Sequence, residues 1–216
     1  LVMDEEITII DSNTRNEKIF NFFINNKKNL IVGFSIILVV IIGFLSMKEV
    51  KERNKIKLAN QFNITTINFK DEDKQTTIDQ LTKLINENDS TYSPLALYFL
   101  IDNNLIDNKK EINSLFNKLI NETNLDEEIK NLIIYKKALF NSDFSSESDL
   151  LQTLSPIINS ESIWKSHSLY LLGEYFYSKG EKQKSKEFFN QILTLANSNS
   201  DVRVKSQKRI NRDFSE

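Results

Sequence analysis

Few side chains in this sequence are suited to chemistry. The chain has no cysteine and one histidine, His167, so it cannot form a disulfide, a thiolate metal site or a site with several imidazoles. Histidine titrates near neutral pH, and His167 is therefore a candidate proton switch. The alternative is a half-exposed packing residue, which we prefer because Trp164 and Leu171 share its predicted helix.

An acidic run, Asp126, Glu127 and Glu128, is the best candidate for acid–base catalysis. Such catalysis requires desolvated carboxylates that converge in a cleft. At the start of a helix the same residues would instead stabilise the helix dipole, which is the simpler interpretation. The sequence thus predicts no catalytic, cofactor-binding or metal-ligating residues and a non-enzymatic protein. An enzyme that uses only carboxylates is an alternative that no motif supports.

The charges are unevenly distributed along the chain. The net charge is −2, without the basic surplus of a nucleic-acid binder. Residues 71–128 contain 13 acids and 5 bases, whereas residues 179–212 contain 9 bases and 3 acids. A solvated helix face explains any one cluster, but the last helix is a candidate site for an acidic partner or anionic headgroups. Its basic residues are Arg203, Lys205, Lys208, Arg209 and Arg212.

One segment has the length and composition of a transmembrane helix. Residues 30–47 (LIVGFSIILVVIIGFLSM) form an 18-residue run without a charge, which matches the hydrocarbon core of a bilayer. A cleaved signal peptide would have a shorter apolar region and a small-residue cleavage site. A buried core helix is the other alternative. The predicted organisation is a tail (1–29), a membrane span (30–47), a membrane-proximal helix and linker (48–75) and a helical domain (76–216).

The surroundings of the span leave two questions open. Four basic residues lie within 15–28 and five within 48–57, so the positive-inside rule does not decide the orientation. Before the span, an apolar cluster precedes Lys27 and Lys28. It either forms an amphipathic helix in the headgroup region or belongs to a disordered tail. The cluster consists of Ile19, Phe20, Phe22, Phe23 and Ile24.

After the span, apolar residues recur at helical spacing and capping signals divide them into helices. The fold class is therefore all-α. Five starts are marked by Thr76-x-x-Asp79, Ser93-Pro94, Asn108-x-x-Glu111, Asn124-x-x-Glu127 and Ser146-x-x-Asp149. Pro156 should kink or end the fifth helix. Helices are also expected over 163–178, 182–197 and 201–213, with Gly180 as the left-handed residue after the first of these.

Short polar connections between these helices predict antiparallel hairpins. Starts at Pro94, near Asp126 and near Ile163 are 32 and 37 residues apart, close to the period of tetratricopeptide repeats (TPR). A partial repeat pattern occupies the last hairpin, with Gly173 and Ser185 as small residues where helices cross. Its large residues are Leu169, Leu172, Phe176 and Phe189. We therefore expect a TPR-like α-solenoid.

The first helix of each hairpin lines the concave surface of a solenoid, where partners usually bind. Tyrosine and tryptophan are frequent in binding hot spots. The candidate partner-binding residues on these helices are Tyr98, Asp102, Tyr135, Lys136, Trp164, Tyr170 and Tyr177.

The layout resembles the ancillary SecYEG translocon subunits of the YfgM type, which are single-pass membrane proteins with a TPR-like domain. STYSPLALYFL is similar to the family's Tyr-x-x-Leu-Ala helix start, and SIWKSHSLYLLGEYFYSKGEKQKSKEFFNQIL is similar to the Trp-led hairpin of alphaproteobacterial members. The resemblance implies an inner-membrane protein with a cytoplasmic N-terminus and a periplasmic domain. It also implies a scaffold that binds translocon subunits and periplasmic chaperones, without cofactor, nucleic acid or small-molecule substrate. A periplasmic scaffold for envelope assembly or cell division is the alternative.

Overall fold

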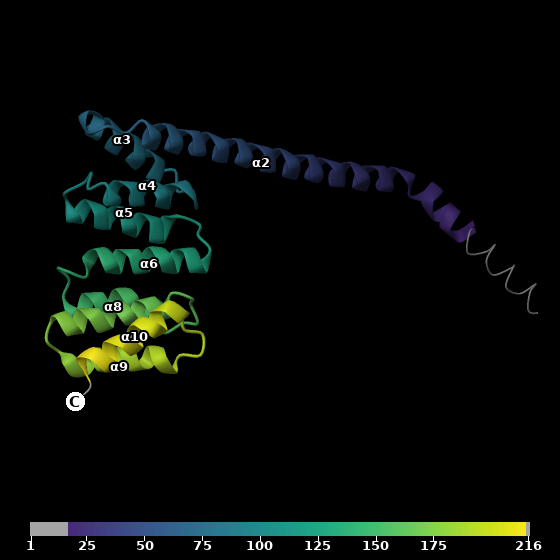
Figure 1. Cartoon of the computed structure of the whole chain (residues 1–216). Coiled ribbons are helices and arrows are strands. Elements are labelled where there is room, and N and C mark those ends of the chain that lie inside the picture. The colour runs from purple at the N-terminus through teal and green to yellow at the C-terminus, as the bar shows by residue number, and fades with distance from the viewer. Residues whose placement is uncertain (1–16, 215–216) are drawn as a thin grey trace, which may run out of the picture. The chain divides into compact units, whose positions relative to one another are not determined.

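The computed structural model describes residues 17–214, apart from the side chain of Asp71, and this part of the chain is helical without strands (Figure 1). The all-α class is thus confirmed. Residues 17–25 are helical, and a 3₁₀ turn covers Asp71–Asp73. Residues 1–16 of the predicted tail lie outside the described residues. The main helices are α2 (Lys27–Ile67), α3 (Lys74–Ile85), α4 (Tyr92–Asp102), α5 (Lys109–Glu122), α6 (Glu127–Asn141), α7 (Glu147–Ile158), α8 (Lys165–Ser178), α9 (Lys182–Thr194) and α10 (Ser200–Asp213).

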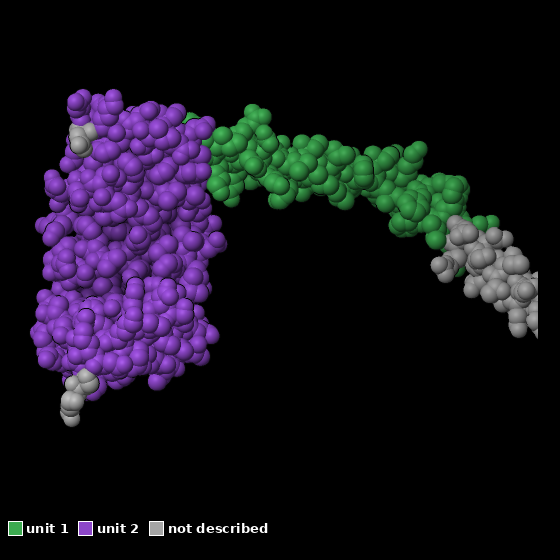
Figure 2. Space-filling view, viewed as in Figure 1, with its two compact units in different colours: residues 1–57 green, residues 58–216 purple. Residues whose placement is uncertain are grey.

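The chain divides into two compact units, residues 1–57 and residues 58–216 (Figure 2). Within the first unit, α2 contains the apolar run 30–47, and none of its side chains there is buried. This helix near the N-terminus is long and apolar enough to cross a membrane.

The second unit begins at Leu58, earlier than the expected domain start at residue 76. Much of the expected linker packs against the other helices. Phe62, near the end of α2, lies with its ring centroid 6.1 Å from that of Tyr92, and Phe69 lies 5.7 Å from Phe99. Both residues flank the first hydrophobic cluster. The partly buried rings of Phe62 and Phe69 therefore belong to the second unit.

Three hydrophobic clusters follow one another through the second unit. The first joins α3, α4, α5 and α6, the second joins α6, α7 and α8, and the third joins α8, α9 and α10. Each helix from α3 onward contacts the next along the chain. In addition, α6 contacts α8 and α8 contacts α10, each pair across an intervening helix. Typical fully buried residues are Leu97, Phe116, Leu154, Leu172, Phe176 and Phe189.

Two of the expected helix caps are confirmed. The Asn108 side chain accepts hydrogen bonds from the backbone N–H groups of Lys110 and Glu111, and that of Ser146 accepts one from Asp149. Gly180 has φ +79°, the left-handed conformation expected after α8. Pro156 lies in the last turn of α7, which ends at Ile158.

Three of the expected capping residues are wrong, although α6 does begin near Asp126 as the repeat spacing predicts. Thr76 lies inside α3, which begins at Lys74, and α6 begins after Asp126 rather than Asn124. Ser93 lies inside α4, where its hydroxyl donates to the Leu84 carbonyl of α3 at 2.9 Å. The Asp89 carboxylate instead accepts from the backbone N–H groups of Thr91, the N-cap residue, and Tyr92, the first residue of α4. At Ser93 a tertiary contact therefore overrode the local signal. Two boundaries also move, because α8 begins at Lys165 and α9 ends at Thr194.

Helices α8 and α9 cross where the sequence places two small residues. A Cβ atom added to Gly173 would lie 2.7 Å from the Phe189 ring, which is closer than carbon atoms can approach. Ser185 is fully buried, and its hydroxyl donates to the Gly173 carbonyl at 2.8 Å. The expected small-residue crossing is thus present.

Candidate partner-binding surface

The candidate surface begins where α4 meets α6. The ammonium of Lys136 on α6 lies 4.9 Å from the centroid of the Tyr98 ring on α4, in a cation–π arrangement. Burial raises the pKa of Tyr98 to about 12, so its phenol is neutral at physiological pH. Both side chains are half-buried. Asp102, at the end of α4, is exposed, and no interaction joins it to the other candidates within the described chain.

A second cluster joins α6 to the start of α8. The rings of Tyr135 and Trp164 stack with centroids 5.9 Å apart and an interplanar angle of 20°. His167 lies 5.3 Å from Trp164 and 6.0 Å from Tyr135. Burial lowers the pKa of His167, the hydrogen bond with the Ile163 backbone opposes this, and the charge of Lys205 lowers it further. Burial thus favours the neutral imidazole, which packs within this aromatic cluster.

A third cluster joins α8 to α10. The Arg209 guanidinium lies 4.3 Å from the centroid of the Tyr177 ring and forms two hydrogen bonds to Glu174, of 2.7 and 2.5 Å. It also pairs with Asp213, and only 13% of its side chain is exposed. Burial and the neighbouring Glu174 raise the pKa of Tyr170 to about 12. Arg209 is thus part of the fold, with its charge already compensated.

The other basic residues of α10 differ in their availability. Arg203 is half-buried and donates to the Leu195 carbonyl, so it secures the connection before α10. Arg212 pairs with Asp213 at 2.8 Å but keeps 67% of its side chain exposed. Lys205 and Lys208 are exposed. Together with their neighbours they line an open recess of about 570 Å³, formed by Tyr170, Lys205, Lys208, Arg209, Asn211 and Arg212.

The acidic run of Asp126, Glu127 and Glu128, the candidate for acid–base catalysis, lies at the start of α6. Asp126 is the N-cap residue, and Glu127 and Glu128 occupy the first turn. Glu128 accepts a hydrogen bond of 2.8 Å from the Ser162 hydroxyl, which links α6 to the segment before α8. Among the described side chains, no group of three or more histidines and carboxylates is placed to hold a metal ion.

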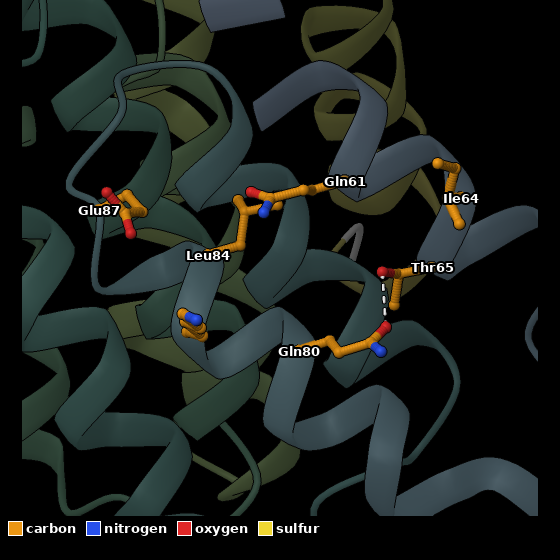
Figure 3. A pocket seen from close by; sticks show the side chains of 7 residues that line it. Gln61, Ile64, Thr65, Gln80, Leu84 and Glu87 are labelled. Atoms are coloured by element: carbon orange, nitrogen blue, oxygen red, sulfur yellow. Dashed lines mark hydrogen bonds between the residues drawn. The ribbon is translucent and has the colours of Figure 1, made fainter. Parts of the chain in front are cut away.

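A separate hollow of about 270 Å³ lies between the last turns of α2 and α3, within the second unit (Figure 3). Thr65 donates a hydrogen bond of 2.9 Å to Gln80 across it. The other lining residues are Gln61, Ile64, Lys83, Leu84 and Glu87. None of the candidate binding residues contributes, and the α2 side of this hollow falls within the segment predicted as a membrane-proximal helix and linker.

No family model, curated protein or solved structure matches the chain. The geometry brings most of the candidate residues together in three clusters, and it adds the carboxylates of Glu174 and Asp213, which are not among the predicted residues. The i, i+4 spacing of Arg209 and Asp213 is a detectable signal. Glu174 lies 35 residues before Arg209, and no local pattern links the two.

Proposed function

We propose that this chain is a non-enzymatic, membrane-anchored scaffold that binds protein partners through a TPR-like α-solenoid. The contacts between alternate helices support the solenoid, because α6 reaches α8 and α8 reaches α10. The close crossing at Gly173 and Ser185 supports its TPR-like character. The unburied apolar run 30–47 supports the anchor.

The observation that carries the binding function is the run of half-buried aromatic and cationic side chains across alternate helices. Lys136 over Tyr98 links α4 to α6, Tyr135 against Trp164 links α6 to α8, and Arg209 over Tyr177 links α8 to α10. Side chains that are already held by their neighbours lose little conformational entropy on binding. A partner can therefore dock on tyrosine and tryptophan at small entropic cost.

The recess beside α10 gives this surface a preference for acidic partners. Arg209 is neutralised by Glu174 and Asp213, whereas Lys205 and Lys208 present their charges to solvent. Charges of this kind accelerate association with an acidic segment in a salt-dependent manner.

The resemblance to YfgM-type subunits supports a more specific proposal. The N-terminus would be cytoplasmic and the second unit periplasmic, where it would bind the SecYEG translocon and periplasmic chaperones during folding of exported proteins. A scaffold for envelope assembly or division shares the same architecture, and the identity of the partners distinguishes the two. Proteolysis in spheroplasts tests the orientation, because protection of the chain beyond Lys48 would place the second unit in the cytoplasm.

Site-specific photocrosslinking in native membranes tests the binding surface. We expect a photoreactive residue at Trp164 or Tyr170 to crosslink translocon subunits. The same residue at Gln152 on α7 or Asn190 on α9, both exposed on the intervening helices, should not. Equal crosslinking at all four positions would refute the surface, and crosslinks only to envelope-assembly proteins would favour the alternative.

Charge reversal tests the role of the recess. We expect Lys205→Glu with Lys208→Glu to lower partner co-purification several-fold, with the largest effect at low salt. The matched control is Lys110→Glu with Lys182→Glu, which reverses two exposed lysines on α5 and α9. Equal yields from the two variants would show that the recess does not select the partner.

A further inference from the structure

The short helix before α2 is strongly amphipathic. Residues 17–25 are helical, and the turn that follows is held by Asn26, whose backbone N–H and side-chain amide both donate to the Phe22 carbonyl at 3.0 Å. This is the segment for which the sequence left an amphipathic helix and a disordered tail as alternatives. The helical backbone favours the first alternative.

The apolar side chains of this helix are all exposed. Ile19, Phe20, Phe22, Phe23 and Ile24 have exposed fractions between 50% and 66%. At 3.6 residues per turn they occupy one continuous sector of about 200°, while Glu17, Lys18, Asn21 and Asn25 occupy the opposite side. An exposed cluster of five large apolar side chains on so short a helix requires something to cover it.

The position of this helix along the chain indicates what covers its apolar side chains. The apolar run of α2 begins at Leu30, only five residues after Asn25. Five helical residues span about 8 Å, so the end of this helix cannot leave the headgroup region once α2 enters the bilayer. Lys27 and Lys28 fall between the two segments, where lysine side chains reach the lipid phosphates. Lys18, Lys27 and Lys28 against Glu17 give the region a positive charge that favours anionic lipids.

We infer that residues 17–25 form an interfacial helix that lies on the bilayer surface, with Ile19 and Phe23 at the centre of the face that contacts the acyl chains. The inference rests on the proposed membrane anchoring of α2. It assigns a second lipid contact to the chain, parallel to the surface rather than through it.

The absence of cysteine from the chain allows a direct test with single labels. Full-length protein would be reconstituted in vesicles of phosphatidylcholine and phosphatidylglycerol, with an environment-sensitive fluorophore on one introduced cysteine. Ile19→Cys and Phe23→Cys place it at the centre of the apolar face, and Asn21→Cys and Asn25→Cys place it on the polar face with the same spacing. Val39→Cys places it inside the apolar run of α2. Quenching by spin-labelled acyl chains and by aqueous iodide is then compared.

We expect acyl-chain quenching to be several-fold stronger at positions 19 and 23 than at 21 and 25, and strongest at 39. Quenching at 39 with equal, weak quenching at the other four positions would overturn the interfacial helix while leaving the anchor intact. Weak acyl-chain quenching at 39 would overturn the anchor itself, and the interfacial helix with it. If labels at positions 19 and 23 were protected from both quenchers, the apolar face would be covered by protein rather than lipid. That result would also overturn the inference.

Discussion

The helix pairs α8–α9 and α5–α6 are both formed by neighbours along the chain, but they are held together differently. In α8–α9 the backbones approach closely because Gly173 has no side chain and Phe189 fills the space above it. In α5–α6 the side-chain amides of Asn113 and Asn141 exchange two hydrogen bonds, of 2.9 and 2.7 Å. One pair therefore depends on shape and the other on a specific polar contact, which predicts different responses to substitution.

The largest expected effect is at Phe189, which is fully buried in the third cluster. Phe189→Ala should lower the free energy of unfolding by about 3–5 kcal/mol, because it removes a buried ring and leaves a cavity. Phe188→Ala is the matched control, since the neighbouring ring is only half-buried and should give a smaller loss. Urea denaturation of each variant measures both values.

The Phe189→Ala variant also tests why α8 and α9 cross so closely at Gly173. Gly173→Ala alone should be destabilising, because the new methyl group strikes the Phe189 ring. In Phe189→Ala protein the obstacle is gone, and Gly173→Ala should become stabilising through the helix propensity of alanine, worth about 1 kcal/mol. If the sign does not reverse, the ring is not what requires a glycine at this position.

An intermediate effect is expected at the amide pair of α5–α6. Asn141→Leu should cost about 1–3 kcal/mol, because it leaves the Asn113 amide without its partner in a partly buried site. Replacing both residues by leucine should recover most of that loss. A double variant as unstable as the sum of the single ones would mean that the two amides act independently.

The smallest expected effect is at the helix caps, where Asn108 before α5 and Asn124 before α6 can be compared. Asn108→Ala should cost about 1 kcal/mol, because its side chain accepts two backbone hydrogen bonds at the start of α5. Asn124→Ala should be nearly neutral, since Asp126 rather than Asn124 occupies the N-cap position of α6. Equal losses would indicate that the start of α6 is set by Asn124 after all.

These cases show which parts of the fold local sequence can predict. Apolar periodicity correctly predicted a helical chain, and Asn108 and Ser146 cap as their patterns indicate because their helix starts are exposed. Ser93 has the same kind of signal, but it is buried against the Leu84 carbonyl, so packing decided its role. Gly173 and Ser185 were recognisable because a close crossing tolerates only small residues.

The candidate surface was predictable to a lesser degree. The repeat spacing predicted that Tyr98, Tyr135 and Trp164 lie on the first helices of successive hairpins. It could not indicate which of their side chains would be in contact. The sequence also treated Arg209 as available to a partner, whereas Glu174, from another helix, neutralises it. Charge counts along a chain do not reveal such pairings, because they depend on which helices become neighbours.

The stacked rings of α6 and α8 have a practical consequence. Trp164 is the only tryptophan of the chain, and it lies against Tyr135 and His167 within the candidate surface. The tryptophan emission of the unmodified protein is therefore a local signal from this one surface. A partner that covers the indole would shift its emission, so that titrations can be followed without any label.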